Sequence, residues 1–359
     1  MLPIRSEMPQ SAVVNSIPTP PPSTAGHARR PAPAPAEAPL AMAPAGRASG
    51  GVPGGGPPSW PGLRRLRVPV RLLRFILRHP LAGRHPAASL LRLLRWQIGG
   101  RLTGMPAVMP FVGPTRLLLQ RGHSSATANH YAGLSDFAEM GFLLHLLRPG
   151  DLFADIGANI GAYTVLAAGV VGAEVLAFEP SPTTLPHLRD NLRLNELEGR
   201  VTLLPLALGE RPGTLRLSAR RGAANRVLLE REAEDAVHIS VSTLDEILPH
   251  RTPLLLKLDV EGYEARVLAG ATRLLARPGL QAVLVETMTH AERYGDSTGR
   301  IDTLLRAQGF APFDYDPRRR ALTPRDAPGD PNTLYLRKVN MVAARLATAP
   351  AVPVLGERF

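Results

Sequence analysis

The sequence predicts a doubly wound α/β domain with a mainly parallel sheet, and three observations lead to that fold class. Short apolar runs alternate with helix-length segments from residue 135 onward, as expected for a sheet covered on both faces. The first run, 152–156, leads into a turn that contains Gly157 and Gly161. The second run is followed by Glu179, 24 residues after Asp155, near the spacing expected of a nucleotide-binding unit.

The individual elements follow from local composition and from Gly and Pro at their ends, such as Pro149-Gly150 after the first helix. The predicted strands are 152–156, 174–178, 201–206, 254–258 and 282–285, with 310–315 and 333–337 closing the sheet as a hairpin and strand-like pieces at 214–217 and 238–241 in an insertion. The predicted helices are 135–147, 162–168, 181–195, 263–275 and 301–308, and residues 107–131 are predicted to form short strands and turns.

The N-terminal part of the chain differs from this domain. Residues 1–58 are dominated by Pro, Ala, Gly and Ser, which offer too few large apolar groups to offset the entropy of ordering. We therefore expect a disordered tail over 1–58. The main domain is predicted to span 105–345, followed by a flexible tail over 346–359.

Residues 59–104 are predicted to form a basic, amphipathic helical segment. Arginines recur every three or four residues from Arg64 to Arg78 with apolar residues opposite them, and 90–96 repeats the pattern. Pro69 is expected to interrupt or kink the first helix. Two interpretations stay open: a helical cap whose leucines pack on the main domain, which is favoured, and docking on an anionic membrane surface or an acidic partner.

Composition excludes several classes of function. The net charge of +12 lies entirely in the first 101 residues, which hold 14 arginines and 2 acidic residues, so the body is neutral and no nucleic-acid partner is expected. The absence of cysteine excludes disulfides, a thiolate nucleophile, Cys-ligated zinc and an iron–sulfur cluster. No leader or long apolar run is found, so we expect a cytoplasmic protein, peripheral at the inner membrane surface under the docking interpretation.

The turn after the first strand indicates which nucleotide is bound. Gly157 permits a sharp turn, Asn159 tolerates left-handed geometry, and Gly161 lets the next helix approach the strand. The turn lacks the G-x-G-x-x-G pattern that serves a pyrophosphate. Asp155 would repel phosphates but suits a cofactor with a sulfonium and an α-amino group, and Glu179 is placed to hold a ribose diol. S-adenosylmethionine fits this combination.

A second group of charges follows the strand 254–258. Lys257 lies inside this apolar strand although the chain has only two lysines against 40 arginines, and it is expected to pair with Asp259 or a neighbouring carboxylate. A purely structural ion pair and a catalytic role remain open for Lys257. Asp259 and Glu261 belong either to the active site or to the start of a helix.

The next strand ends in Glu286, so this carboxylate is expected in the same crevice, with His290 shortly after it. The sequence does not choose among Asp259, Glu261, Glu286 and His290 as the general base.

These residues resemble the FkbM family of S-adenosylmethionine-dependent methyltransferases over about residues 130–340. The resemblance rests on Asp155-Ile-Gly-Ala-Asn-Ile-Gly161, Ala177-Phe-Glu-Pro180, 188–195 with its two asparagines, Thr243-Leu-Asp245, Lys257-Leu-Asp-Val-Glu-Gly262 with Glu264, and Val285-Glu286. It implies the seven-stranded, Rossmann-like class I methyltransferase sheet and transfer to a hydroxyl of a sugar, glycolipid or natural product. The expected cofactor contacts are Asp155, Gly157, Asn159, Gly161, Thr164, Glu179, Pro180 and Ala207, and the expected catalytic residues are Lys257, Asp259, Glu261 and Glu286.

Residues 206–209, Leu-Ala-Leu-Gly, offer no acid for adenine, so backbone groups and apolar packing are expected to hold it. No metal is expected, because the carboxylates lack a clear ligand pattern. Two rival functions remain. A nicotinamide oxidoreductase would want the missing G-x-G-x-x-G, and its Tyr-x-x-x-Lys pair is also absent. A non-catalytic protein with a relict cofactor site would work through its basic N-terminal segment.

Overall fold

The computed structural model describes residues 70–359, apart from 121–123, 219–224, 230, 231, 233, 234, 288 and 330. The chain divides into two units, 1–59 and 60–359, and the description below concerns the second. The disordered tail predicted over 1–58 lies outside the described residues, as do 59–69 of the predicted helical segment. Among the described residues no helix is long and apolar enough to cross a bilayer.

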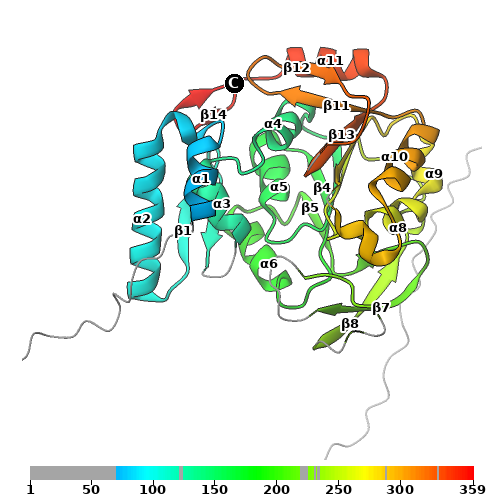
Figure 1. Cartoon of the computed structure of the whole chain (residues 1–359), viewed down its shortest axis with the longest axis horizontal. Coiled ribbons are helices and arrows are strands. Elements are labelled where there is room, and N and C mark those ends of the chain that lie inside the picture. Colours follow the sequence, from blue (N-terminus) through cyan, green and yellow to red (C-terminus); the bar gives the residue numbers. More distant parts are fainter. Residues whose placement is uncertain are drawn as a thin grey trace, which may run out of the picture. The chain divides into compact units, whose positions relative to one another are not determined.

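The centre of this unit is an eight-stranded sheet (Figure 1). Its strands lie in the spatial order β12 (Ala321–Pro324), β11 (Ala311–Asp316), β13 (Asn332–Leu336), β10 (Ala282–Glu286), β9 (Leu255–Leu258), β3 (Leu152–Ile156), β4 (Glu174–Phe178) and β5 (Val201–Leu204). The run from β10 to β5 is parallel, whereas β13 is antiparallel to both β10 and β11. The mainly parallel α/β fold predicted from the sequence is therefore confirmed.

The edge of the sheet differs from the prediction in one respect. All seven predicted strands are present, and β11 and β13 pair with each other as expected. The strand that follows β11 directly is β12, which pairs Ala321 with Asp316 across a short turn and adds an eighth strand at the edge. Its sequence, Ala-Leu-Thr-Pro, carries little apolar signal because the strand is largely exposed.

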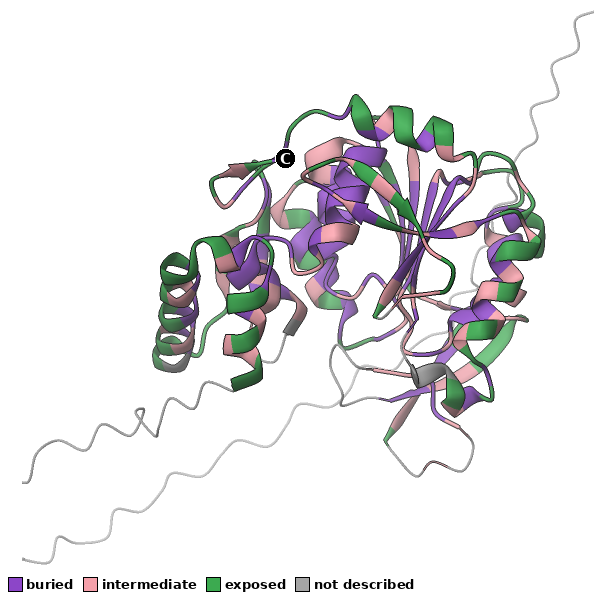
Figure 2. Cartoon of the chain, turned by 45° about the horizontal axis from the view of Figure 1, so that its top comes forward, coloured by how far each residue is buried: buried purple, intermediate pink, exposed green. Residues whose placement is uncertain are grey.

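Alternate side chains of the strands feed two hydrophobic cores, one on each face of the sheet. Phe153, Val175 and Leu255 face the first core, whereas Ala154, Leu176 and Leu256 face the second. The first core is covered by α4 (Phe137–Leu146), α5 (Ala162–Val165) with its π-helical continuation η2 (Leu166–Val171), α6 (Leu185–Leu194) and α11 (Val339–Ala347). The second is covered by α7 (Leu244–Ile247), α8 (Glu264–Ala269), α9 (Thr272–Leu275) and α10 (Thr298–Ala307). Figure 2 shows the strands buried between these layers.

The N-terminal elements of the described unit join the first core. They are α1 (Val70–Arg78), η1 (Ala82–Arg84), α2 (Pro86–Thr103), β1 (Ala107–Pro110), β2 (Arg116–Leu119) and α3 (Ser124–Ala132). Helix α1 begins directly after Pro69, where the sequence predicts an interruption, and Ile76, Leu93 and Trp96 are buried. These contacts agree with the interpretation as a helical cap. The prediction of strands and turns over 107–131 is wrong from residue 124 on, because that stretch forms α3.

The insertion after β5 forms a three-stranded sheet. Its order is β6 (Ala207–Leu208), β8 (Ala236–Ser242) and β7 (Gly213–Ser218), and its two longer strands contain the predicted pieces 214–217 and 238–241. β6 continues the chain from the end of β5, so the small sheet is attached at the carboxyl edge of the large one.

The C-terminal residues pack on the domain instead of forming the flexible tail predicted over 346–359. After α11 the chain forms a hairpin of β14 (Pro353–Val354) and β15 (Glu357–Arg358). The ring of the terminal Phe359 is buried against Phe137, with ring centroids 5.0 Å apart. Because these contacts join residues far apart in the chain, local composition gave no sign of them.

Candidate active site

Four strands of the parallel sheet bring their carboxyl ends to one edge. Ile156 on β3 pairs with Phe178 on β4 and with Leu258 on β9, and Leu258 in turn pairs with Val285 on β10. The residues that follow these positions are Gly157, Glu179, Asp259 and Glu286. Ligands of open α/β sheets bind at this edge, so the register brings the predicted cofactor and catalytic groups to one place.

The turn after β3 depends on two glycines. Gly157 has φ +76°, and a Cβ on it would lie 1.9 Å from the Asp259 carbonyl oxygen. Gly161 has φ +89°, and a Cβ there would lie 2.4 Å from a methyl group of Leu188 on α6. Asn159 also has a positive φ, +53°, which Asn tolerates better than most residues. At Gly157 and Gly161 the turn thus lies so close to the end of β9 and to α6 that no residue with a Cβ fits there.

Gly157→Ala tests this close approach. We expect it to lower the free energy of unfolding by at least about 3 kcal/mol, because the new methyl group meets a backbone carbonyl that cannot move without shifting the end of β9. Gly150→Ala is the matched control, since Gly150 has a similar φ of +83° but open space around its Cα; its cost should be about 1–2 kcal/mol. Urea unfolding of both variants measures the difference, and equal losses would contradict the steric account.

Glu179 is held in place by backbone groups. Its two carboxylate oxygens accept hydrogen bonds from the backbone N–H of Ser181 at 2.8 Å and of Asn159 at 2.9 Å. The side chain is buried, and burial raises the pKa of Glu179 to about 7, although these two hydrogen bonds act in the opposite direction. A carboxylate has about four lone-pair sites, so it can accept further donors from the cavity.

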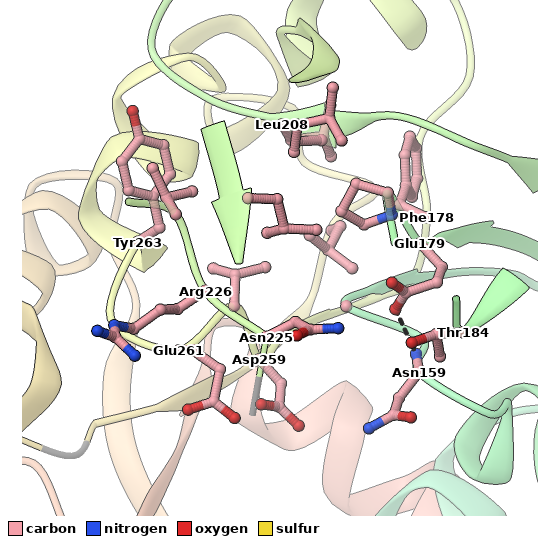
Figure 3. Close-up of a pocket in the computed structure, with 18 of the residues that line it drawn as sticks. Asn159, Phe178, Glu179, Thr184, Leu208, Asn225, Arg226, Asp259, Glu261 and Tyr263 are labelled. Atoms are coloured by element: carbon pink, nitrogen blue, oxygen red, sulfur yellow. Dashed lines mark hydrogen bonds between the residues drawn. The ribbon is translucent and has the colours of Figure 1, made fainter. Parts of the chain in front are cut away.

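The cavity beside Glu179 has a volume of about 710 Å³, counted with the space at its mouth, within the usual range for small-molecule sites. Figure 3 shows Leu208 towards one end, and Asp259 with Glu261 towards the other. The apolar part is lined by Phe178, Pro180, Leu206, Ala207, Leu208, Leu217, Val227 and Ile239. Leu217 and Ile239 belong to β7 and β8, so the insertion forms one wall, which the sequence did not predict.

Asp155 and Lys257 do not line the cavity. Asp155 is fully buried, accepts a 2.7 Å hydrogen bond from the Thr164 hydroxyl and lies 3.7 Å from the Lys257 ammonium. The ammonium donates to Asp259 at 3.0 Å and lies 4.9 Å from the centroid of the Tyr163 ring. The predicted direct contact of Asp155 and Thr164 with a ligand is therefore not what the geometry favours; they support the turn and Lys257.

The protonation state of Lys257 follows from this environment. Burial alone would lower its pKa, but the carboxylates of Asp259 and Asp155 outweigh that effect and hold the pKa above its usual value. Lys257 therefore stays charged and is not available as a general base.

Lys257→Met should destabilise the protein by about 3–5 kcal/mol, because it leaves Asp155 buried without a compensating charge. Arg251→Met is the control: its ion pair with Glu174 is about half exposed on both sides, and such pairs contribute about 0–1 kcal/mol. The free energy of unfolding in urea measures both. A loss for Lys257→Met no larger than that of the control would contradict the buried pairing.

Further carboxyl groups lie around Asp259; Glu261 lines the cavity, whereas Glu286 does not. Glu286 has a buried Oε2 without a hydrogen-bond partner, and burial together with the charge of Asp259 raises its pKa to about 8. Burial and Asp259 likewise raise the pKa of Glu261 to about 7. Glu264 is different, since its Oε1 accepts hydrogen bonds from the backbone N–H of Val260 and Gly262 and so shapes the loop after β9.

Two further acidic residues at the start of α4 were missed by the sequence prediction. Asp136 accepts a 3.0 Å hydrogen bond from the Tyr163 hydroxyl, and burial raises its pKa, with Asp259 and Lys257 also acting on it. Glu139 is 3.4 Å from the Asn332 side-chain amide, and its pKa is also raised by burial. In the sequence, the position of Asp136 indicates only the start of a helix. In the structure it is the N-cap residue of α4, but its side chain makes no capping hydrogen bond.

Two other predictions are not settled by these contacts. His290 lies in the short helix η4 (Thr289–Tyr294), and its side chain is outside the described part of the chain. Within the described ranges no group of three or more His, Asp or Glu residues could hold a metal ion. Metal independence therefore stays a prediction.

Most residues of this site lie in a region that is similar to known proteins. Residues 155–312 match the family model described as the methyltransferase FkbM domain. The chain is 30% identical over 199 residues to the 31-O-demethyl-FK506 methyltransferase FkbM of Streptomyces tacrolimicus, covering 46% of this chain and 74% of that protein. It is 31% identical over 136 residues to the hexuronic acid methyltransferase AglP of Haloferax volcanii, covering 37% of this chain and 55% of that protein.

Among solved structures, the chain is similar to the precorrin-6y C5,15-methyltransferase of Geobacter metallireducens. The identity is 12%, the TM-score is 0.34, and the match covers 57% of this chain and 89% of that one. A likeness this distant adds nothing to the topology described above.

Proposed function

The chain belongs to the FkbM family and is a methyltransferase, and on that premise we propose that it moves a methyl group from S-adenosylmethionine to a hydroxyl oxygen of a sugar, glycolipid or natural product. The observation that carries the proposal is Glu179, a buried carboxylate at the edge of an apolar cavity that can accept hydrogen bonds beyond the two it already accepts. The two relatives act on 31-O-demethyl-FK506 and on hexuronic acid, which supports an acceptor of this kind.

The residues of the cavity fit this cofactor. The charged form of Glu179 is costly while it has only two donors, as its raised pKa indicates, and a ribose diol offers two more. Phe178, Leu208 and Ile239 provide apolar surfaces for adenine, in line with the predicted lack of an acid at 206–209. Asp259 and Glu261 at the other end suit a group with positive charge. S-adenosylmethionine supplies a methyl group on a sulfonium, already activated for displacement.

The protein then has two tasks, to align the acceptor oxygen and to take its proton. Alignment contributes the larger share, since proximity can supply roughly 7–11 kcal/mol and a general base about a hundred- to ten-thousandfold. Among the four candidates for the base, we propose Glu286. Asp259 is occupied by Lys257 at 3.0 Å, whereas Glu286 has a buried oxygen without a hydrogen-bond partner and a pKa raised to about 8.

We propose that the acceptor site includes Asp136 and Glu139, the two acidic residues that the sequence analysis missed. Asp136, Glu139 and Glu286 are carboxyl groups whose pKa values are raised by burial, and such groups accept hydrogen bonds from neighbouring hydroxyls of a polyol. This arrangement favours a hydroxyl-rich acceptor over a purely apolar one. Asp155, Thr164 and Lys257 act as positioning residues beneath the cofactor.

An acceptor screen tests the proposal. Methyl-labelled S-adenosylmethionine would be incubated with the full chain and with a hexuronic acid, a neutral sugar, a glycolipid and a polyhydroxylated macrolide, and label on each acceptor would be measured. We expect label on at least one hydroxylated acceptor and none on an amine control. Cofactor binding with label only on the amine would contradict O-methylation. No binding of the cofactor would favour the relict-site alternative.

A further inference from the structure

The outward face of α2 is apolar, contrary to what a surface helix normally shows. Leu91, Leu94, Ile98 and Leu102 are spaced by three or four residues and therefore lie on one face of the helix. They are 47%, 44%, 42% and 72% exposed, respectively. We call these four residues the α2 stripe.

The opposite face of the same helix packs against the rest of the domain. Leu93 and Trp96 are buried in the first core, and Arg92 donates hydrogen bonds to Ser89 and to the Tyr131 carbonyl. The helix is thus attached to the domain by one side and presents the α2 stripe on the other. Figure 1 shows α2 at the margin of the described unit, beside α1. A contiguous exposed apolar surface of this kind marks an interaction site more often than a random surface.

The sequence on either side of the α2 stripe is basic. No Asp or Glu occurs between Glu37 and Asp136, a span that contains 13 arginines. Arg95 lies on α2 next to Leu94, and Arg71, Arg74 and Arg78 are exposed on α1. Within the part of the chain that the structure describes, none of these four arginines pairs with an acidic side chain.

We propose that the α2 stripe docks on an anionic lipid bilayer. A helix with apolar side chains flanked by arginines can insert its leucines at the boundary of headgroups and acyl chains while the guanidinium groups reach the phosphates. The surface is the ridge of a single helix, which suits a planar bilayer, and the long span without acidic residues is complementary to anionic headgroups. This contact would place the enzyme at a membrane surface, independently of which acceptor it methylates.

Vesicle sedimentation of the full chain tests the proposal. The vesicles are phosphatidylcholine alone and an equimolar mixture of phosphatidylcholine and phosphatidylglycerol. We expect sedimentation with the mixture, little with phosphatidylcholine alone, and release at high salt. Leu94→Ser combined with Ile98→Ser should weaken partitioning by about tenfold or more, and Arg95→Glu by at least about fivefold. Met341→Ser on α11, which also removes an exposed apolar side chain, should leave it unchanged.

Three results would overturn the proposal. The first is no sedimentation with the anionic vesicles, and the second is equal sedimentation of the stripe variants and the wild type. The third is a change of oligomeric state of the stripe variants in lipid-free solution with vesicle binding intact, which would make the α2 stripe a contact between copies of the chain. Circular dichroism and S-adenosylmethionine affinity of each variant, both expected to match the wild type, exclude unfolding as the cause of lost partitioning.

Discussion

Replacing Glu286 by glutamine is expected to lower kcat by about a hundred- to ten-thousandfold, because the variant cannot take the proton of the acceptor hydroxyl. Glutamine has nearly the same size and keeps one oxygen acceptor, so the affinity for S-adenosylmethionine should change little. Steady-state kinetics with a hydroxylated acceptor, together with direct cofactor binding, separate the two effects. A loss of cofactor affinity as large as the loss of kcat would mean that Glu286 shapes the cavity instead of acting as base.

The pH profile identifies the base more sharply than the loss of activity does. A base works in its deprotonated form, so kcat/KM of the wild type should rise with pH and level off above the pKa of Glu286, about 8. Glu261→Gln is the matched control, since that carboxyl also lies near Asp259 and has a pKa of about 7. The rise should persist in Glu261→Gln, at a lower pH because the charge of Glu261 contributes to the raised pKa of Glu286, and it should vanish in Glu286→Gln. The opposite pattern would assign the proton transfer to Glu261.

Glu179→Ala is expected to weaken S-adenosylmethionine binding by about a hundredfold. Hydrogen bonds to a charged group contribute about 1.5–3 kcal/mol each, and the variant loses those to the ribose. It also removes the acceptor that fixes the backbone N–H of Asn159 and Ser181. Calorimetric titration of the variant measures the loss.

Glu179→Gln is the control for that experiment, because the amide keeps one oxygen acceptor in the same place. Its affinity should lie between those of the wild type and Glu179→Ala. If both variants bind the cofactor as tightly as the wild type, the ribose is not held by Glu179.

Much of the fold could be predicted because the central strands are continuous apolar runs. Residues 153–156 and 175–178 are buried on both faces, and the two strands keep the same bounds in the structure as in the prediction. Helix α3 was missed because its sequence is mostly small and polar, and it is stabilised by distant packing of Ala126 and Tyr131. The C-terminal hairpin was missed for the same reason, since Phe359 packs against the distant rings of Phe137 and His145.

The sequence predicted those site residues whose positions are determined by the backbone. Gly157, Asn159 and Glu179 lie on the cavity because a strand and its following turn determine where they lie. The contacts between side chains were harder to predict from the sequence. Asp155 was predicted to contact a ligand, yet it is buried beside Lys257, its register partner on β9, and does not line the cavity. Asp136 and Leu217 reach the site from segments whose place beside it depends on tertiary packing alone.

The central claim is that the cavity beside Glu179 holds S-adenosylmethionine. The most direct test is calorimetric titration of the wild-type chain with S-adenosylmethionine, with NAD, which shares the adenosine group, as a control ligand. The structure leads us to expect saturable binding of S-adenosylmethionine at one site per chain and no heat from NAD. Binding of NAD, or no binding of S-adenosylmethionine, would contradict the assignment of the cavity and with it the roles given to Glu179, Asp259 and Glu286.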